Sequence, residues 1–337
     1  MSVITRSLGS SRVSAIGYGA MGISSFYGPI LTDELRMKAL DAVYESGCTH
    51  WDTADVYGDS EELIGKWLKK TGKRNDIFLA TKFGMTLNRS EPGTRPVNGE
   101  PSYVVSAIDR SLKRLGVDFV DLWYLHRADP MVPIELTVRK MAEQVKAGKV
   151  KHIGLSEVSA ATLRRAHAVH PITSIQVEYS PFALDIEQNG VLVTARELGV
   201  KIDAYSPVGR GLLTGKIRSP DDLDPIDMRR FLPRFAAANF PKVLAVVDRI
   251  QAIADAHAAT PSQVAIAWVL AQGDDFLPIP GSTKPANIHE NMAAAALQLT
   301  PEEIAEIRTL AEGADIGERH PAAIARLINA ESPALVE

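Results

Sequence analysis

The sequence has little cysteine, no long apolar run and almost no net charge. Its 337 residues include one cysteine, Cys48, which excludes an intrachain disulfide and favours a reducing compartment. No stretch of about 18 apolar residues occurs, and the first residues lack the apolar core of a secretory signal. The 37 Lys and Arg residues against 41 Asp and Glu give a formal charge of −4, unlike the basic surface that nucleic acid requires. We therefore expect a cytoplasmic protein that binds neither a membrane nor nucleic acid.

Residues that bind metal ions are also sparse. A single cysteine cannot form a cysteine cluster, and His50, His126 and His152 lack partners at the spacing of a metal motif. We therefore predict no metal site. Cys48 is interpreted as a small buried side chain and His50 as a packed or capping residue.

What the sequence does contain is an alternation of short β-branched apolar runs and helical segments. This pattern is typical of parallel strands joined by crossover helices. Eight such strands are predicted, the number that closes a (β/α)8 TIM barrel. The predicted strands are Val13–Gly17, Thr49–Asp52, Ile77–Thr81, Val120–Leu125, Lys151–Leu155, Thr173–Glu178, Lys201–Tyr205 and Phe276–Ile279.

Capping residues and a 3, 4, 7 apolar spacing identify the helices between these strands. We expect helices over Asp33–Glu45, Glu61–Lys70, Tyr103–Leu115 and Ser262–Ala271. Two additional helices are expected, Pro241–Ala258 before the last strand and Pro301–Ala311 after the barrel.

The remaining segments complete one predicted domain over residues 1–337. Val3–Leu8 and Val13–Ala15 flank a turn, which predicts an N-terminal β-hairpin that plugs one end of the barrel. Two long loops, 83–101 and 209–239, and a tail, 313–337, do not fit the strand–helix repeat. Loops of this length in a compact domain are usually functional or disordered, and we expect all three segments over the barrel mouth.

Polar residues occur at or just after the carboxyl ends of most predicted strands. In a barrel these ends face the same mouth, where active sites are found. Any one of them could be an ordinary cap or turn residue, but their joint placement predicts a site. The residues are Asp52, Lys82, His126, Ser156, Gln176, Tyr205 and Ser206.

Four residues at this mouth suggest proton transfer. Tyrosine is normally a weak acid with a pKa of about 10. An ammonium at Lys82 would lower the pKa of Tyr57, and the Asp52 carboxylate could hold that ammonium in place. His126 could then orient a substrate carbonyl, so the group suits reduction of C=O. The alternative for Asp52 and Lys82 alone is a buried structural ion pair.

Six segments containing these residues resemble the ordered motifs of the aldo-keto reductase superfamily, and the resemblance runs from about residue 14 to residue 296. It implies a (β/α)8 barrel that binds NADPH, with NADH possible, and reduces an aldehyde or ketone. It also implies a catalytic tetrad of Asp52, Tyr57, Lys82 and His126, with Tyr57 as the general acid. The six segments are Trp51–Gly58, Ala80–Lys82, Asp121–His126, Gly154–Glu157, Tyr205–Gly211 and Ile279–Lys284.

The same resemblance assigns residues to the cofactor. It implies that Tyr205 stacks on the nicotinamide, while Ser156 and Gln176 bind its carboxamide. Residues implied at the pyrophosphate are Ser206, Val208, Gly209 and Gly211; those at the adenosine end are Ser282, Thr283, Lys284, Glu290 and Asn291. Further cofactor contacts are expected from Gly19, Ala20, Met21, Asp52, Pro207, Lys216, Ile279, Gly281 and Asn287.

The sequence departs from the family pattern at two cofactor positions. Glu157 stands where many relatives carry asparagine, and Asn287 stands where an arginine is usual. Lys284, with Arg210 as a further candidate, is then expected to provide the positive charge for a 2′-phosphate.

The expected substrate pocket is apolar with one polar focus. Its predicted residues are Met21, Phe26, Tyr27, Tyr57, Met85 and His126. Some members of the superfamily are instead regulatory subunits that bind the nucleotide and associate with ion channels, and this alternative stays open.

A Rossmann dehydrogenase is a second alternative, because Gly17, Gly19 and Gly22 match G-x-G-x-x-G. That motif needs a helix at its third glycine, whereas Gly28 and Pro29 predict no immediate helix. We therefore expect these glycines to belong to the first loop of a barrel.

Overall fold

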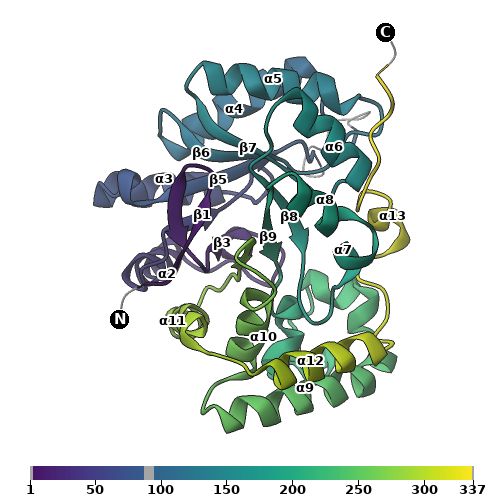
Figure 1. Ribbon diagram of the computed structural model, residues 1–337. Helices are drawn as coiled ribbons and strands as arrows, with labels where there is room; N and C mark the ends of the chain where they lie inside the picture. The colour runs from purple at the N-terminus through teal and green to yellow at the C-terminus, as the bar shows by residue number, and fades with distance from the viewer. Residues whose placement is uncertain (1–2, 87–94, 336–337) are drawn as a thin grey trace.

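The computed structural model describes residues 3–86 and 95–335 (Figure 1). Part of the predicted 83–101 loop, residues 87–94, and the last two residues of the predicted tail lie outside this range. Within it, eight parallel strands form one sheet in the order β10-β9-β8-β7-β6-β5-β4-β3. The strands are β3 (Tyr18–Gly19), β4 (His50–Asp52), β5 (Phe78–Phe83), β6 (Val120–Leu125), β7 (Val150–Ser156), β8 (Ser174–Glu178), β9 (Lys201–Tyr205) and β10 (Phe276–Ile279).

Backbone hydrogen bonds between the first and last strands close this sheet into a barrel. Gly17 N donates to Pro278 O at 2.9 Å, and Gly19 N donates to Pro280 O at 3.3 Å. The predicted (β/α)8 TIM barrel is therefore confirmed.

The first predicted strand is wrong, whereas the predicted hairpin is present. Val13 and Ser14 belong to β2 (Ser11–Ser14), which pairs antiparallel with β1 (Thr5–Leu8). The first barrel strand is β3, with only two residues, too short to produce a recognisable apolar run. Leu8 and Val13 of the hairpin pack against side chains inside the barrel, including Leu122 and Leu277.

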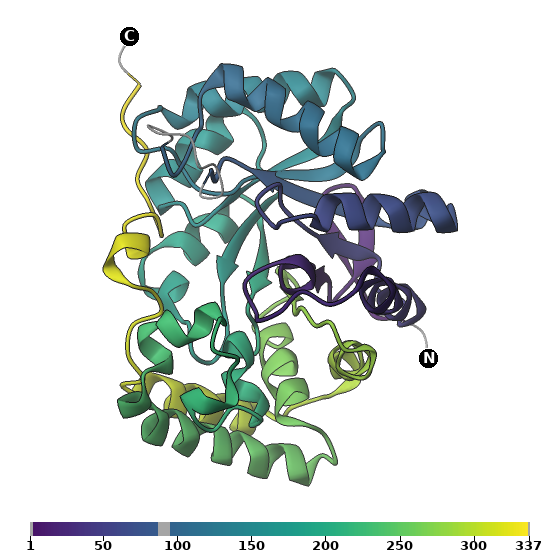
Figure 2. The ribbon, with the colours of Figure 1, turned by 180° about the vertical axis from the view of Figure 1, so that it is seen from behind.

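Helices surround the barrel close to the predicted positions. The helices between strands are α2 (Asp33–Glu45), α3 (Ser60–Thr71), α4 (Pro101–Leu115), α5 (Ile134–Lys146), α6 (Ala160–Val169), α7 (Asp185–Gln188), α8 (Val191–Glu197), α9 (Phe240–Ala256) and α10 (Pro261–Leu270). After β10 come α11 (Pro285–Ala293), α12 (Pro301–Gly313) and α13 (Ala322–Ala325). The two additional helices, α9 and α12, lie side by side in Figures 1 and 2. Among the described residues, no helix is long and apolar enough to span a membrane.

The expectation of no immediate helix after Gly22 needs a correction. A one-turn helix, α1 (Met21–Ser24), follows β3 directly. The crossover helix α2 begins only at Asp33, where the Thr32 hydroxyl caps it by accepting from Leu35 N. The four-residue α1 is much shorter than the crossover helix that follows a Rossmann glycine motif.

The C-terminal tail is fixed to the barrel at several points. Ala330 forms a β-bridge with Val158, just beyond the end of β7. The Ser332 hydroxyl accepts from Ile134 N at 2.7 Å, and Arg165 donates to the carbonyl of Ser332 at 2.8 Å. Figures 1 and 2 show that the tail continues from α12 past α13 along one side of the barrel.

Candidate active site

Three neighbouring strands and one turn bring the predicted tetrad together. Asp52 ends β4, Lys82 lies near the end of β5, and His126 directly follows β6. The backbone N–H of His126 donates to Phe83 O at 2.8 Å, which fixes the two strand ends relative to each other. Tyr57 lies in the turn after β4. All four side chains are buried, with exposures between 0% for Lys82 and 8% for Tyr57.

Lys82 lies at the centre of this group. Its ammonium donates to Asp52 Oδ1 and, at 2.8 Å, to the carbonyl oxygen of Thr53. The same nitrogen lies 5.1 Å from the centre of the Tyr57 ring. The His126 ring contacts Tyr57 nearly perpendicularly, with ring centres 5.7 Å apart and an interplanar angle of 85°. Lys82 therefore connects the carboxylate to the phenol, in the order that the sequence predicted.

The direction of the Tyr57 pKa differs from the expectation. Burial raises the pKa of Tyr57, and the positive charge of Lys82 offsets this effect only in part. Burial alone would lower the pKa of Lys82, but Asp52 and Tyr57 together raise it, so the ammonium stays charged. Burial, together with the charges of Arg127 and Lys82, lowers the pKa of His126 well below its usual value. The site thus holds a protonated phenol beside a cation and a neutral imidazole.

A polar group beneath the tetrad was missed by the sequence analysis. Asp203, in the middle of β9, is completely buried, and burial raises its pKa to about 6. Its Oδ2 accepts from Tyr124 Oη at 2.8 Å and from Gln176 Nε2 at 3.3 Å, and it lies 3.6 Å from His50 Nε2. Gln176 Nε2 also donates to Asp52 Oδ2 at 2.9 Å. An aspartate between the apolar strand residues Ile202 and Ala204 was the available signal.

The residues expected at the nicotinamide belong to β7, β8 and β9. Ser156 and Gln176 are nearly completely buried, at 1% and 3% exposure. The Glu157 carboxylate binds groups of the protein itself. Its Oε1 accepts from Tyr205 Oη at 2.8 Å and from Glu178 N at 2.9 Å. Glu157 therefore holds Tyr205, the residue expected to stack on the ring.

The segment expected at the pyrophosphate begins with an unusual backbone. Ser206, Gly209 and Gly211 all have positive φ, at 53°, 58° and 98°. The N–H groups of Gly209 and Gly211 donate to Ser206 O and Val208 O inside the turn, so these two expected amide donors are already engaged. Pro207 lies inside this turn, and Lys216 is exposed just beyond it.

Arg210, the further candidate for the 2′-phosphate, is directed inward instead. Its guanidinium forms an ion pair with Glu178 at 2.9 Å and is only 10% exposed. Lys284, in contrast, is exposed at the start of α11 and belongs to no ion pair within the described residues.

Tight backbone packing brings the end of β3 and the loop after β10 together. A Cβ atom at Gly281 would come within 2.3 Å of Gly19 O, and one at Gly19 within 2.7 Å of Ile279 O. These two glycines are therefore required by barrel closure itself. Tyr18 Oη donates to Ser282 O at 3.0 Å, which holds the same loop.

The remaining residues expected at the adenosine end belong to or precede α11. Asn291 is buried, Thr283 and Asn287 are half-buried, and Lys284 is exposed. Glu290 is already engaged, because its Oε1 accepts from the hydroxyl of Thr260 at 2.9 Å, next to the start of α10.

Apolar side chains surround Tyr57 on the expected substrate side. Met21 and Met85 pack against the cluster that contains Tyr57. The Phe26 ring lies 6.4 Å from the Tyr57 ring at 90°. The guanidinium of Arg229 stacks over Tyr27, 4.6 Å from its ring centre, an interaction that the sequence did not suggest. Ala20, the remaining residue expected near the cofactor, is buried beside β3 and donates to Asp52 O.

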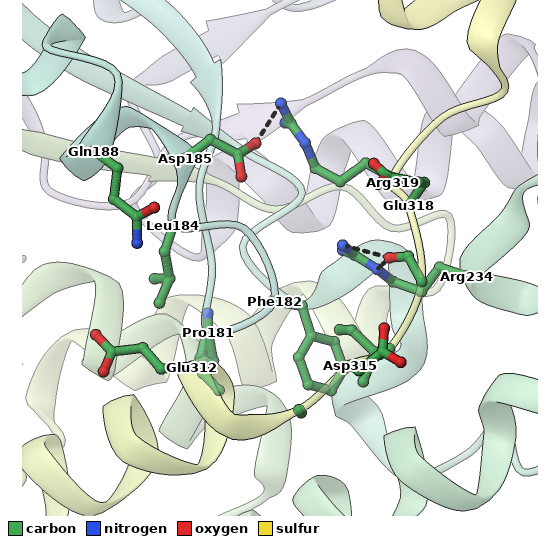
Figure 3. A pocket seen from close by; sticks show the side chains of 14 residues that line it. Pro181, Phe182, Leu184, Asp185, Gln188, Arg234, Glu312, Asp315, Glu318 and Arg319 are labelled. Carbon is green, nitrogen blue, oxygen red and sulfur yellow. Dashed lines mark hydrogen bonds and ion pairs between the residues drawn. The ribbon is translucent and has the colours of Figure 1, made fainter.

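A separate cavity of about 490 Å³ lies between the loop after β8, the 209–239 segment and the tail (Figure 3). No tetrad residue lines it. Arg319 of the tail reaches across it to Asp185 at 2.7 Å, while its other nitrogen lies 3.8 Å from Glu157 and 3.6 Å from Glu178. The tail thus supplies a charge next to the residue that holds Tyr205. No local sequence pattern could have indicated this contact.

Neither the tetrad nor its surroundings suggest a metal centre. Within residues 3–86 and 95–335, no group of three or more His, Cys, Asp or Glu side chains is placed to hold a metal ion. The neighbouring strands β7, β8 and β9 carry a hydroxyl at Ser156, an amide at Gln176 and an aromatic ring at Tyr205, groups that fit a nicotinamide.

Comparison with known proteins gives a consistent result. The pattern of the aldo/keto reductase family matches residues 15–312. The chain is 56% identical to aldo-keto reductase str7 of Strobilurus tenacellus, over 99% of both chains. It is 46% identical to aldo-keto reductase yakc [NADP(+)] of Schizosaccharomyces pombe, again over 99% of both.

Solved structures of related proteins share the fold. The glycerol dehydrogenase AKR11B4 from Gluconobacter oxydans superimposes with a TM-score of 0.82 at 26% identity, covering 100% of both chains. The thermostable aldo-keto reductase Tm1743 superimposes with a TM-score of 0.73 at 29% identity, covering 91% of this chain and 99% of the other.

Proposed function

Because the chain belongs to the aldo/keto reductase family, we propose that it reduces aldehydes or ketones to alcohols with NADPH. When bound, the nicotinamide supplies the hydride to the carbonyl carbon. The observation that carries this proposal is the buried contact of Lys82 with both Asp52 and the Tyr57 ring. This contact places a permanent positive charge beside the only phenol of the tetrad.

The four residues then have distinct tasks. Tyr57 keeps its proton at neutral pH because the ordinary pKa of tyrosine is about 10 and burial raises it further, so it can donate that proton to the carbonyl oxygen. Lys82 stabilises the phenolate left behind, and Asp52 fixes the ammonium. His126 is neutral and lies beside the Tyr57 ring, so it can hydrogen-bond and orient the carbonyl oxygen.

The cofactor would lie across the carboxyl ends of β7 to β10. Tyr205 would stack on the nicotinamide, and Ser156 and Gln176 would bind the carboxamide. Exposed Lys284 would bind the 2′-phosphate, which favours NADPH over NADH. The name of the Schizosaccharomyces pombe relative includes NADP(+), which agrees with this choice.

The substrate would enter on the side of Met21, Phe26 and Met85. These apolar side chains surround the single polar focus formed by Tyr57 and His126. The pocket therefore suits small carbonyl compounds with an apolar body. One barrel domain and one buried cysteine, Cys48, are compatible with action in the cytoplasm.

Oxidation of NADPH in the presence of aldehydes and ketones tests the proposal. We expect turnover by the parent protein, and a loss of about 10²–10⁴-fold in Tyr57→Phe. NADPH binding, measured separately by fluorescence titration, should be similar in both. If the parent protein bound NADPH but reduced no carbonyl compound, and Tyr57→Phe behaved identically, a nucleotide-binding regulatory subunit would be the better description.

A further inference from the structure

A buried arginine outside the tetrad lies next to the residues expected at the carboxamide. Arg127 follows His126 directly and is only 9% exposed. Its Nη1 donates to His126 O at 2.6 Å and to Ser156 Oγ at 3.1 Å. Among the described residues no carboxylate lies within ion-pair distance of it, in contrast to Arg210 with Glu178. Neutralising an acidic side chain therefore does not explain why this guanidinium is buried.

The contact with Arg127 occupies one acceptor position of the Ser156 hydroxyl. A guanidinium has donors and no acceptor, so the Ser156 oxygen must accept from Arg127. A serine hydroxyl has only one hydrogen, and this hydrogen is left for a partner other than Arg127. Among the hydrogen bonds of the described residues, the Ser156 hydroxyl hydrogen has no assigned acceptor, so it is available to a group bound at the mouth.

Gln176 has the opposite role. Its Nε2 donates to Asp52 Oδ2 at 2.9 Å and to Asp203 Oδ2 at 3.3 Å, which uses both amide hydrogens. Carboxylates accept only, so the amide cannot be reversed without losing both bonds. The Oε1 atom of Gln176 is left as an acceptor.

Glu157, which follows Ser156 in the chain, already has hydrogen-bond partners within the protein. Glu157 Oε1 accepts from the Tyr205 hydroxyl and from Glu178 N. For the two ends of a carboxamide, Ser156 offers a donor and Gln176 offers an acceptor.

We propose that Arg127 is a positioning residue that fixes Ser156 as a hydrogen-bond donor, so that Ser156 binds the carboxamide oxygen and Gln176 binds its NH2 group. The inference rests on the proposed nicotinamide binding. It predicts a single orientation of the carboxamide and makes its recognition depend on a residue that does not touch it.

Dissociation constants for NADP+, measured by calorimetry, test the coupling. We expect Arg127→Met and Ser156→Ala each to weaken binding about 3- to 10-fold, the contribution of one hydrogen bond. The double variant should bind no more weakly than Ser156→Ala, because Arg127 acts through that hydroxyl. Fully additive losses would overturn the inference. Arg127→Lys, which keeps a donor, should recover part of the affinity.

A matched control removes a guanidinium from the opposite end of the barrel. Arg6 is 12% exposed and donates to the carbonyls of Phe276 and Leu270. Arg6→Met should leave the NADP+ dissociation constant within about twofold of the parent value, within the usual effect of a substitution distant from the site. An equal loss in both arginine variants would indicate a general effect on folding and overturn the specific role of Arg127.

A cofactor analogue in which an acetyl group replaces the carboxamide distinguishes binding of the carboxamide oxygen from binding of its NH2 group. The acetylpyridine analogue of NADP+ keeps the oxygen and lacks the NH2 group. Ser156→Ala and Arg127→Met should therefore weaken the analogue by the same factor as NADP+. If they weakened NADP+ alone, Ser156 would bind the NH2 group and the proposal would be wrong. If the parent protein bound no NADP+ at all, the proposed function itself would fail.

Discussion

The two halves of the barrel mouth are built in different ways. On the side of β4, β5 and β6, three strand ends and one turn supply the tetrad, and Lys82 interacts within this local group. On the side of β7, β8 and β9, two buried carboxylates, Glu157 and Glu178, meet arginines from the 209–239 segment and from the tail. The first half is determined by the barrel itself. The second half is completed by Arg210, which is 32 residues from Glu178, and by Arg319 of the tail, which is more than a hundred residues away.

The largest effect is expected from a substitution in the tetrad half of the mouth. Lys82→Met should reduce carbonyl reduction about 10²–10⁴-fold, because the phenolate of Tyr57 loses its neighbouring cation. NADPH affinity should change little, since Lys82 contacts Asp52, Thr53 and Tyr57. The measurement is kcat with saturating NADPH beside a separate binding titration. A rate within about threefold of the parent would contradict the proposed relay.

On the tail side of the mouth, we expect a substitution to lower the stability of the fold more than the rate of the reaction. Arg319→Met leaves Glu157 and Glu178, both 2% exposed, with fewer positive neighbours. Breaking a buried pair destabilises the fold, here on the order of 3 kcal/mol in the free energy of unfolding. Urea denaturation measures this loss, with exposed Arg326→Met as the control within the same tail. Equal unfolding midpoints for the two variants would show that the tail arginine is dispensable.

This contrast also explains how far the sequence alone could lead. The positions of Asp52, Lys82 and His126 were predictable because each lies at or just after the carboxyl end of a predicted strand. The contacts of Arg319 with Glu157 and Glu178 were not, since they depend on where the tail folds back.

Local sequence rules failed at three other places, for physical reasons. Strand β3 has two residues, too few for a hydrophobic pattern to distinguish it from the adjacent hairpin strand. The net direction of the Tyr57 pKa was missed because burial outweighs the neighbouring cation, and burial is a property of the whole fold. Glu157 was recognised as unusual, but its bond to Tyr205 joins residues 48 positions apart and depends on the pairing of strands in the barrel.

The pH dependence of the reaction shows whether burial or the neighbouring positive charge dominates the pKa of Tyr57. Reduction requires the protonated phenol, and burial raises its pKa above the ordinary value of about 10. With saturating NADPH, kcat should therefore stay flat from about pH 6 to pH 9 and fall only at higher pH. His126 should not titrate in this window, because its pKa is lowered well below its usual value. A decline centred near neutral pH would contradict this assignment of the proton donor.

The smallest expected effect lies at the far end of the cofactor. Lys284 is exposed, so its attraction for a 2′-phosphate is screened by water and salt. Lys284→Met should weaken NADPH binding about fivefold at low ionic strength. NADH, which lacks that phosphate, serves as the internal control and should bind the variant as it binds the parent. Raising the salt concentration should reduce the difference between parent and variant, because an exposed charge is screened while the buried contacts around Lys82 are not. An equal loss for both nucleotides would show that Lys284 supports the loop before α11 and does not select the phosphate.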